Sequence, residues 1–538
     1  MRLPNALYAD GIQKGRQNRF GGLNHNDGAG DGEIWSMKNL SSDYYPLLAT
    51  RPRRMKLQTL TKGNGLFAWE KLCWVDGTGF YYDGVLKGQV SDSEKSFAAI
   101  NGYIIIMPDK LYYNIFDDKF GTMEPSITAE NVNFQDGTIY GESAEANTVY
   151  CADVDWGTYF RAGDAVTISG ASAEANNVSI IIREISGHEM RFYENSFTNG
   201  ADSGVTFKRE VPRLKFMCEN ENRLWGCNDT TIYASKLGDP FNFNVYDGLD
   251  TDSFAVDTGS AGVFTGCISY LGYPTFFKER NIYKVYGSKP SNYEVMGSAT
   301  LGLAEGSHKS LAVAGETLFY LSRSGICVYT GGTPQPINRA FGLARYKNAV
   351  GGSDGLKYYV SMQDGSGTWH LFVYDTQKGM WHEEDETHAI GFAYSEGNLY
   401  FLGGDNAIWI TGNIQDAPAG AVQESAFSWS AEFTDFLDYS GKGGNPGTRG
   451  ISKIIIRLDM DEGASCTVKL QLDDTGVWIT PNNGTLSEAR KRSNCLAIIP
   501  QRADIYRLRL EGTGGCRIYN ITREYYQGSE LKTVAGRQ

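Results

Sequence analysis

The fold is decided by residues 212–332, which contain three segments with one common pattern. They read PRLKFMCENENRLWGCNDTTIYASKLGDPFNF (212–243), GCISYLGYPTFFKERNIYKVYGSKP (266–290) and TLGLAEGSHKSLAVAGETLFYLSRSGICVYTGG (300–332). In each segment, a short run of alternating apolar and polar residues leads into a turn of Asn, Asp, Gly or Ser, and a second run ends in an aromatic residue. Period-two alternation between such turns is typical of antiparallel hairpins. Hairpins repeated at roughly 40–50 residues predict the blades of a degenerate β-propeller.

The same pattern extends to both sides of this stretch. Residues 61–124 contain Asp76-Gly77 and Asp83-Gly84 steps, which suit the tight type I′ turns of hairpins. We therefore expect the first blades in residues 61–124 and the remaining blades in residues 211–415. The intervening residues 125–210 contain runs such as SIIIREI, which predict a few curved strands. We expect them to form a small β-barrel inserted in an exposed loop between blades.

The two ends of the chain differ from the blades. Residues 1–60 are rich in Gly, Asn and Asp without a strong period, so they are expected to form an extended N-terminal arm. A Pro, Ala and Gly linker at 416–424 precedes residues 425–530, in which apolar and polar residues alternate cleanly. This alternation predicts a C-terminal β-sandwich of jelly-roll character, followed by a tail at 531–538.

The composition limits both fold class and partners. The chain has 538 residues, 41% of them hydrophobic, with 64 Gly and 32 Tyr. No long segment keeps a helical period of 3.6 residues, so an all-β fold with several domains is expected. The formal net charge of −13 disfavours a surface that wraps nucleic acid, because phosphate binding needs a basic face. An acidic wall is still compatible with DNA that slides past without binding.

The nine cysteines include no CxxC pair, and most lie in apolar strand patterns. This favours buried free thiols in a reducing compartment over a framework of disulfides. The N-terminal MRLPNALYADGIQKG lacks the apolar core of a signal peptide, and no run of about 18 apolar residues occurs. Neither export through a signal peptide nor a membrane span is therefore expected.

Two motifs resemble sites of chemistry. Residues 382–388 read HEEDETH, which gathers His382, Glu383, Glu384, Asp385 and His388 without the HExxH spacing of zinc sites. We interpret them as a charged, exposed loop between strands. Residues 364–369 (DGSGTW) resemble a sialidase-type Asp box, but they lack its full glycine pattern and are not repeated, so a hairpin turn is expected.

The remaining polar groups have equally simple interpretations. The six histidines are too scattered to ligate one metal ion by their spacing, and Asp117-Asp118 and Asp473-Asp474 fall at turns. The RPRR cluster at 51–54 is compatible with a phosphate contact, with a solvated turn and with a contact between subunits. Neither GxSxG nor GxxxxGK[ST] occurs. We therefore expect no catalytic residues, no cofactor-binding or metal site, no cofactor, and no enzymatic activity.

Three groups of residues resemble the tail hub, or nozzle, proteins of short-tailed bacteriophages, which include packaged-DNA stabilisation proteins. The resembling residues are NRLW (222–225), IYAS (232–235) and DPFNF (239–243), then FFKERNIYKVYG (276–287), and then GL (302–303) with FYLSRSGI (319–326). At the level of motifs the match covers residues 210–330, and these motifs contain no catalytic residues.

The resemblance implies a virion component that is assembled in the cytoplasm of a bacterial host. Such a protein is expected to form a homo-oligomeric ring, a hexamer, below portal and adaptor proteins. Its channel retains and then passes double-stranded DNA without sequence specificity, and its far end holds a needle or fibres. No membrane insertion is implied. The inserted barrel departs from the simplest members of the family, so its partners stay open.

Two other functions remain open from the sequence. One is a carbohydrate-binding or glycan-degrading propeller with a jelly-roll module, in which Trp369, Trp381 or Trp409 stacks on sugars, although each also fits a strand whose aromatic residue packs in the core. The other is a baseplate or distal tail protein of a long-tailed phage, which shares the architecture and differs in its neighbours.

Overall fold

The computed structural model describes residues 12–26, 30, 32–136, 147–193, 197–412, 414, 417–436, 447–487, 491–499, 502–503 and 505–530. Within these residues the secondary structure consists of β-strands and of 3-10 helices of three or four residues, so the predicted all-β class is confirmed. No helix in the described part is long and apolar enough to cross a membrane. The chain forms two compact units, residues 61–308 and residues 1–60 together with 309–538.

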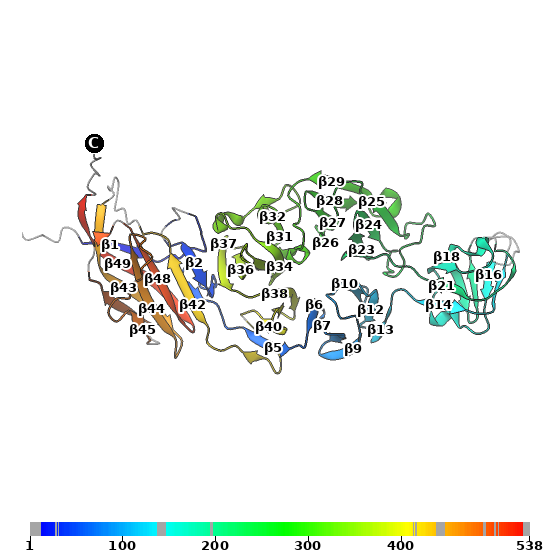
Figure 1. Ribbon diagram of the computed structural model, residues 1–538, viewed down its shortest axis with the longest axis horizontal. Coiled ribbons are helices and arrows are strands. Elements are labelled where there is room, and N and C mark those ends of the chain that lie inside the picture. Colours follow the sequence, from blue (N-terminus) through cyan, green and yellow to red (C-terminus); the bar gives the residue numbers. More distant parts are fainter. Residues whose placement is uncertain are drawn as a thin grey trace, which may run out of the picture. The chain divides into compact units, whose positions relative to one another are not determined.

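The unit of residues 61–308 contains four antiparallel sheets of four strands each, and each sheet is a simple meander (Figure 1). Their strands are β6 (Gly63–Trp69), β7 (Lys71–Asp76), β8 (Gly79–Tyr82) and β9 (Val85–Gln89); β10 (Ser96–Ile100), β11 (Tyr103–Met107), β12 (Leu111–Asn114) and β13 (Lys119–Thr122); β22 (Phe216–Asn220), β23 (Arg223–Asn228), β24 (Thr231–Ala234) and β25 (Phe254–Asp257); and β26 (Gly266–Tyr270), β27 (Tyr273–Lys278), β28 (Asn281–Tyr286) and β29 (Glu294–Ala299). The first strands of successive sheets touch, β10 with β22 and β22 with β26, as they do in the blades of a propeller.

The other unit contains three sheets of the same kind. Their strands are β30 (Ala312–Ala314), β31 (Thr317–Ser322), β32 (Gly325–Tyr329) and β33 (Gln335–Pro336) in the fifth sheet; β34 (Lys347–Ser353), β35 (Lys357–Gln363), β36 (Trp369–Asp375) and β37 (Met380–Asp385) in the sixth sheet; and β38 (Ala389–Ser395), β39 (Asn398–Gly403), β40 (Ala407–Ile410), β5 (Met55–Thr59) and β41 (Val422–Gln423) in the seventh sheet. Here too the first strands touch in order, β30 with β34 and β34 with β38. The described residues therefore form a propeller-like succession of seven sheets, as the hairpin pattern predicts.

The insertion between β13 and β22 is a closed barrel, drawn in cyan in Figure 1. Its strands are β14 (Ser126–Ala129), β15 (Val132–Gln135), β16 (Asn147–Tyr150), β17 (Ala165–Ser169), β18 (Ser179–Ser186), β19 (Glu189–Phe192), β20 (Gly200–Asp202) and β21 (Val205–Lys208). The ladder runs β14-β21-β17-β18-β19-β16-β15-β20. Because β14 leads directly into β15 and β20 into β21, the ladder returns to its start, and closure leaves no free sheet edge.

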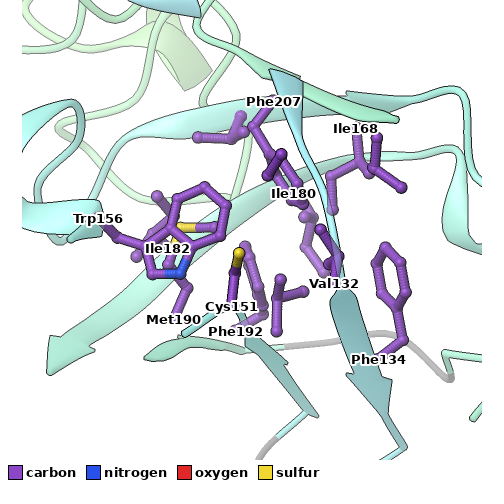
Figure 2. Close-up of a cluster of buried hydrophobic side chains, with 14 of the residues drawn as sticks. Val132, Phe134, Cys151, Trp156, Ile168, Ile180, Ile182, Met190, Phe192 and Phe207 are labelled. Carbon is purple, nitrogen blue, oxygen red and sulfur yellow. The ribbon is translucent and has the colours of Figure 1, made fainter. Parts of the chain in front are cut away.

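A separate hydrophobic core fills this barrel. Trp156, in the 3-10 helix η1 (Trp156–Thr158), and Phe207 pack edge to face with ring centroids 4.7 Å apart, and both side chains are buried. The indole Nε1 of Trp156 donates to the carbonyl of His188 at 3.0 Å, which satisfies its polar atom. Figure 2 shows these two rings with Ile182, Met190 and Phe192 gathered between the strands. The insertion thus has its own core within this unit.

Two further sheets form the C-terminal β-sandwich. One contains β3 (Leu40–Ser41), β4 (Leu48–Thr50), β49 (Cys516–Glu530), β43 (Gly447–Met460) and β46 (Arg492–Ala497), with β1 (Ile12–Gln17) paired to β49 and β47 (Arg502–Ala503) to β43. The other has the order β2 (Ile34–Lys38), β42 (Ser428–Phe433), β48 (Tyr506–Thr513), β44 (Ser465–Leu472) and β45 (Thr485–Leu486). Between them, the guanidinium of Arg523 lies 3.8 Å from the ring centroid of Phe436.

The N-terminal residues differ from the expected extended arm. Strands β1 to β4 are built into the two sandwich sheets, and β5 pairs with β40 as a strand of the seventh sheet. The expected linker also contributes, because Val422 and Gln423 pair with β5. Apart from the local pairing of β3 with β4, these pairings join residues about 350 or more positions apart, so no local pattern in residues 12–60 encodes them. The predicted tail at 531–538 lies outside the described residues.

Candidate functional site

Arg51 and Arg54 from the RPRR cluster are buried in an ionic cluster. Arg54 Nη2 lies 2.6 Å from Glu384 Oε2, and Arg54 Nη1 lies 2.9 Å from Asp385 Oδ2. Arg51 pairs with the carboxylate of Glu424 and donates from Nε to Asn39 Oδ1 at 2.6 Å. The solvated turn is wrong for Arg51 and Arg54, because both are buried and hold the N-terminal segment against the sixth sheet and residue 424.

Residues 382–388 are not the exposed loop that the sequence suggested. Residues 382–385 lie in β37, and His382 and Glu384 alternate with Glu383 and Asp385, so that the first two are buried. Burial acts to raise the pKa of Asp385, but the charges of Arg54 and Arg51 and the hydrogen bonds to Thr387 and Arg54 together outweigh it, so the pKa is lowered. Buried carboxylates are tolerated here because each has an arginine partner.

The two histidines of this sheet have opposite electrostatic surroundings. His370 lies between two carboxylates, with Nδ1 2.7 Å from Glu383 Oε1 and Nε2 3.3 Å from Asp364 Oδ2. The hydrogen bond to Glu383 is the main cause that raises the pKa of His370. His382 is buried beside Lys357, and burial lowers its pKa to about 4. The two carboxylates therefore favour the protonated form of His370, whereas His382 is a neutral core residue at neutral pH.

The Asp-box-like residues 364–369 form the hairpin turn between β35 and β36, as expected. The Asp364 carboxylate accepts hydrogen bonds from the backbone N–H groups of Ser366 and Thr368, both at 2.9 Å. The hydrogen bond from the Ser366 hydroxyl is the main cause that lowers the pKa of Asp364 to about 2, and the hydrogen bonds from the backbone N–H groups add to it. The aspartate is thus fully engaged in closing the turn.

A second ionic cluster joins the inserted barrel to the third sheet (β22–β25). Asp164, at the start of β17, is fully buried, and its Oδ2 accepts from Arg209 Nη1 at 2.7 Å. Its Oδ1 accepts from Asn242 Nδ2 at 2.9 Å, and Asn242 Oδ1 accepts from the N–H of Ala165 at 3.1 Å. Asn242 belongs to the loop between β24 and β25. The barrel is therefore fixed to the blade by directional, buried contacts.

Aromatic residues extend this junction. The guanidinium of Arg161 pairs with Asp239 at 2.5 Å and lies 5.3 Å from the ring centroid of Phe241. Arg209 covers the same ring at 5.1 Å, and Tyr103 meets its edge at 4.9 Å. Phe241 and its neighbours come from the DPFNF segment, so this part of the phage-hub resemblance lies at the barrel junction.

The other resembling residues also have structural contacts. Arg223 of NRLW is buried, and it donates to the carbonyls of Ser235 and Asp250, each at 2.8 Å, and to that of Asp252. It therefore holds the loop between β24 and β25. The side chains of Phe276 and Phe277 are fully buried in the fourth sheet, and those of residues 318–321 are buried in the fifth sheet.

The three tryptophans considered for sugar stacking have different surroundings. Trp381 is buried and donates from Nε1 to the carbonyl of Ile337 at 3.0 Å, so it is a core residue. Trp369 stacks on His388 with ring centroids 3.8 Å apart. Trp409 is half-buried and donates from Nε1 to Asp405 Oδ2 at 3.1 Å.

The aspartate pairs and the cysteines considered in the sequence analysis have the following surroundings. Asp118 is paired with Lys87 at 2.7 Å and accepts from the Tyr113 hydroxyl at 2.7 Å. Asp473 and Asp474 occupy left-handed backbone positions in the turn after β44. The nine cysteines are free thiols, and Cys495 is exposed. Within the described ranges, no group of three His, Cys, Asp or Glu side chains is placed to hold a metal ion.

No family model and no curated protein sequence matches the chain. Among solved structures, U3-55K is similar with a TM-score of 0.32 and 7% identity, over 67% of this chain and 98% of that one. BamB from Moraxella catarrhalis is similar with a TM-score of 0.23 and 11% identity, over 69% and 99% of the two chains. The β-propeller domain of Nup133 from Vanderwaltozyma polyspora gives 0.22 and 11%, over 67% and 98%. These similarities concern the fold alone.

The barrel junction is the feature that sequence reasoning missed. Asp164 stands in a turn before a strand, where a solvated carboxylate is the ordinary expectation, and its partners are 45 and 78 positions away. The one available signal was Arg209, a charged residue at the end of the apolar run VTFK, directly before the blade pattern resumes.

Proposed function

We propose that this chain is a structural component of a phage tail, a hub or nozzle subunit, and not an enzyme. The observation behind the proposal is that two buried ion pairs join segments far apart in the sequence. These pairs are Asp164 with Arg209 and Arg54 with Glu384. Burying charges is costly unless they are paired. Here the pairs fix a barrel to a blade and the N-terminal segment to the sixth sheet, which suits a rigid assembly part.

The phage-hub resemblance supports the same proposal. Its residues Arg223 and Phe241 hold the loop and the junction from which the barrel is oriented. In this proposal the chain forms a homohexameric ring, contacts portal and adaptor proteins on one side and a needle or fibres on the other, and passes double-stranded DNA. The net charge of −13 favours a wall along which DNA moves without binding.

Ring formation by the purified full-length chain tests this proposal. Mass photometry is expected to show a species of six times the 59.3 kDa chain mass, and negative-stain images are expected to show closed rings. Because some rings assemble only on a neighbouring protein, the measurement is repeated with the portal and adaptor proteins encoded by the same phage. A monomer that neither closes into rings alone nor joins that complex would contradict the proposal.

A further inference from the structure

The loop that follows β33 carries a very exposed apolar side chain. Leu343 is 92% exposed, the highest value among the large apolar side chains of the described residues. Three exposed cations lie near it in the sequence, Arg339, Arg345 and Lys347, and within the described part of the chain none of them has an acidic partner at ion-pair distance. We call residues 339–347 the basic loop. A single exposed leucine is ordinary on a protein surface, but the way in which this one is presented is not.

The basic loop is held firmly from below. Phe341 is buried and packs against Trp381 with ring centroids 4.9 Å apart, and the backbone N–H of His25 donates to the carbonyl of Ala340 at 2.8 Å. Gly342 has a φ of 56° and a ψ of −123°, and a Cβ there would lie 2.8 Å from the carbonyl oxygen of His25. A backbone conformation that only glycine adopts easily therefore places the next residue, the exposed leucine, in solvent.

A second exposed loop has the complementary composition. Residues 246–250 (YDGLD), between β24 and β25, are all exposed, and Tyr246 and Leu249 are 58% and 60% exposed. Arg223 holds this loop from the protein interior by donating to the carbonyl of Asp250 at 2.8 Å. We call residues 246–250 the acidic loop. It offers two large apolar side chains and two carboxylates on a supported backbone.

Charge is divided unevenly between the parts of the chain that carry the two loops. Residues 61–308, with the acidic loop, contain 33 acidic and 19 basic residues, whereas the rest of the chain, with the basic loop, contains 30 and 31. Asp250 pairs with Lys289 at 3.1 Å, but both side chains are exposed, so this pair is weak and the carboxylate stays accessible to a further cation. A second copy of the chain therefore presents negative charge that suits the three cations of the basic loop.

The leucine at the tip of the basic loop disfavours other anionic partners. Phosphates of DNA would satisfy the cations, but the phosphate backbone offers no apolar surface for Leu343. An anionic membrane would bury a single leucine, and binding of that kind scales with the apolar area that is buried. The acidic loop of a second copy offers carboxylates and apolar side chains together. A contact between two different surfaces of identical chains is heterologous, and such contacts can close into rings.

We propose that the basic loop of one copy docks on the acidic loop of a second copy. Leu343 packs against Tyr246 and Leu249, and the surrounding cations lie beside Asp247 and Asp250. This inference rests on the proposed ring and names the residues of its subunit contact.

Analytical ultracentrifugation of the full-length protein tests the contact with Leu343→Gln in the basic loop and Leu249→Gln in the acidic loop. Both replacements remove apolar surface at exposed positions, and thermal melting checks that each variant folds. The matched controls are Leu356→Gln and Leu271→Gln, at leucines that are 55% and 54% exposed in turns of the sixth and fourth sheets. The two loop variants are also mixed, because each one supplies the loop that the other lacks.

We expect the wild type and both controls to associate into the same ring, and each loop variant alone to associate at least ten-fold more weakly. The equimolar mixture should form a species of twice the 59.3 kDa chain mass and nothing larger, because one intact contact joins the two chains. Rings that persist in both loop variants would overturn this contact and leave the ring proposal standing.

A mixture that forms no dimer would also overturn the contact. The same holds if Leu343→Gln loses binding to DNA or to phosphatidylglycerol vesicles while its self-association is unchanged. A wild-type chain that stays monomeric on its own at high micromolar concentration would overturn the contact too. Assembly with the portal and adaptor proteins would then decide the ring proposal separately.

Discussion

Arg209 Nη1 donates to Asp164 Oδ2 at 2.7 Å, and both side chains are buried where the inserted barrel meets the third sheet. Asp164 lies before β17, in the middle of the insertion, and Arg209 follows β21 at its C-terminal end. Their pairing therefore fastens the middle of the insertion to its end and, through Asn242, to the blade.

Replacing Asp164 by Ala is expected to lower the free energy of unfolding by about 3–5 kcal/mol, because Arg209 would remain buried without its counter-charge. Chemical denaturation of the purified protein measures the change. The matched control is Glu386→Ala, which removes an exposed pair with Lys38 and should leave stability nearly unchanged. Equal effects of the two substitutions would contradict a structural role for the barrel junction.

Loss of Arg54 is expected to loosen the seventh sheet. In Arg54→Met, Glu384 and Asp385 lose their shortest ion pairs in a buried site, so the unfolding free energy should fall by about 3 kcal/mol or more. Faster amide hydrogen exchange in β5 and β40 would follow. Arg53→Met, one position away and half-buried, is the control and should change neither quantity appreciably. Unchanged exchange in Arg54→Met would show that the ion pairs do not hold this sheet.

Arg223→Met should release the loop between β24 and β25. Three backbone carbonyls lose a common donor, and each unsatisfied buried acceptor costs about 1–3 kcal/mol. Limited proteolysis is therefore expected to cut within residues 236–253 sooner than in the wild type. Arg213→Met, an exposed arginine before the same sheet, should keep the wild-type cleavage pattern. A wild-type cleavage pattern in Arg223→Met would contradict the role of Arg223 in holding this loop.

Because of His382, we expect the free energy of unfolding to decrease in mild acid. Its folded pKa of about 4 is below the ordinary value of 6.5, so below pH 6.5 the unfolded chain takes up a proton that the folded chain does not. The contribution is lost as pH falls from about 6.5 to about 4 and amounts to about 3 kcal/mol in all. His370 affects stability in a different pH range. Because its pKa is raised in the folded protein, it stabilises the fold below pH 6.5, and this contribution is lost as the pH rises through the folded pKa.

Urea denaturation at pH values from 4.5 to 7.5 measures this dependence. His382→Gln has no titrating group at this position and should show a flatter profile between pH 6.5 and 4.5 than the wild type. His25→Gln is the comparison, because burial also lowers the pKa of His25 and only a smaller change is expected there. Identical profiles of His382→Gln and wild type would assign the acid sensitivity to other groups.

Local sequence patterns predicted the strands well, because short apolar runs between turn residues mark segments that pack in a core. The runs around Leu224 and Phe319 are strands of this kind, and they are buried on both faces. Period-two alternation was available for residues 382–385, but four charged or polar residues in a row obscured the alternation of His382 and Glu384. The cost of burying these groups is met by arginines more than 300 positions away, and no local pattern shows such partners.

We propose that this chain is part of a phage tail, and the most direct test is its location and copy number in purified particles of a phage whose genome encodes it. Immunogold electron microscopy with an antibody against the chain is expected to label the tail, and quantitative mass spectrometry is expected to give six copies per particle. A particle that lacks the chain, or carries it only in the capsid shell, would contradict the account.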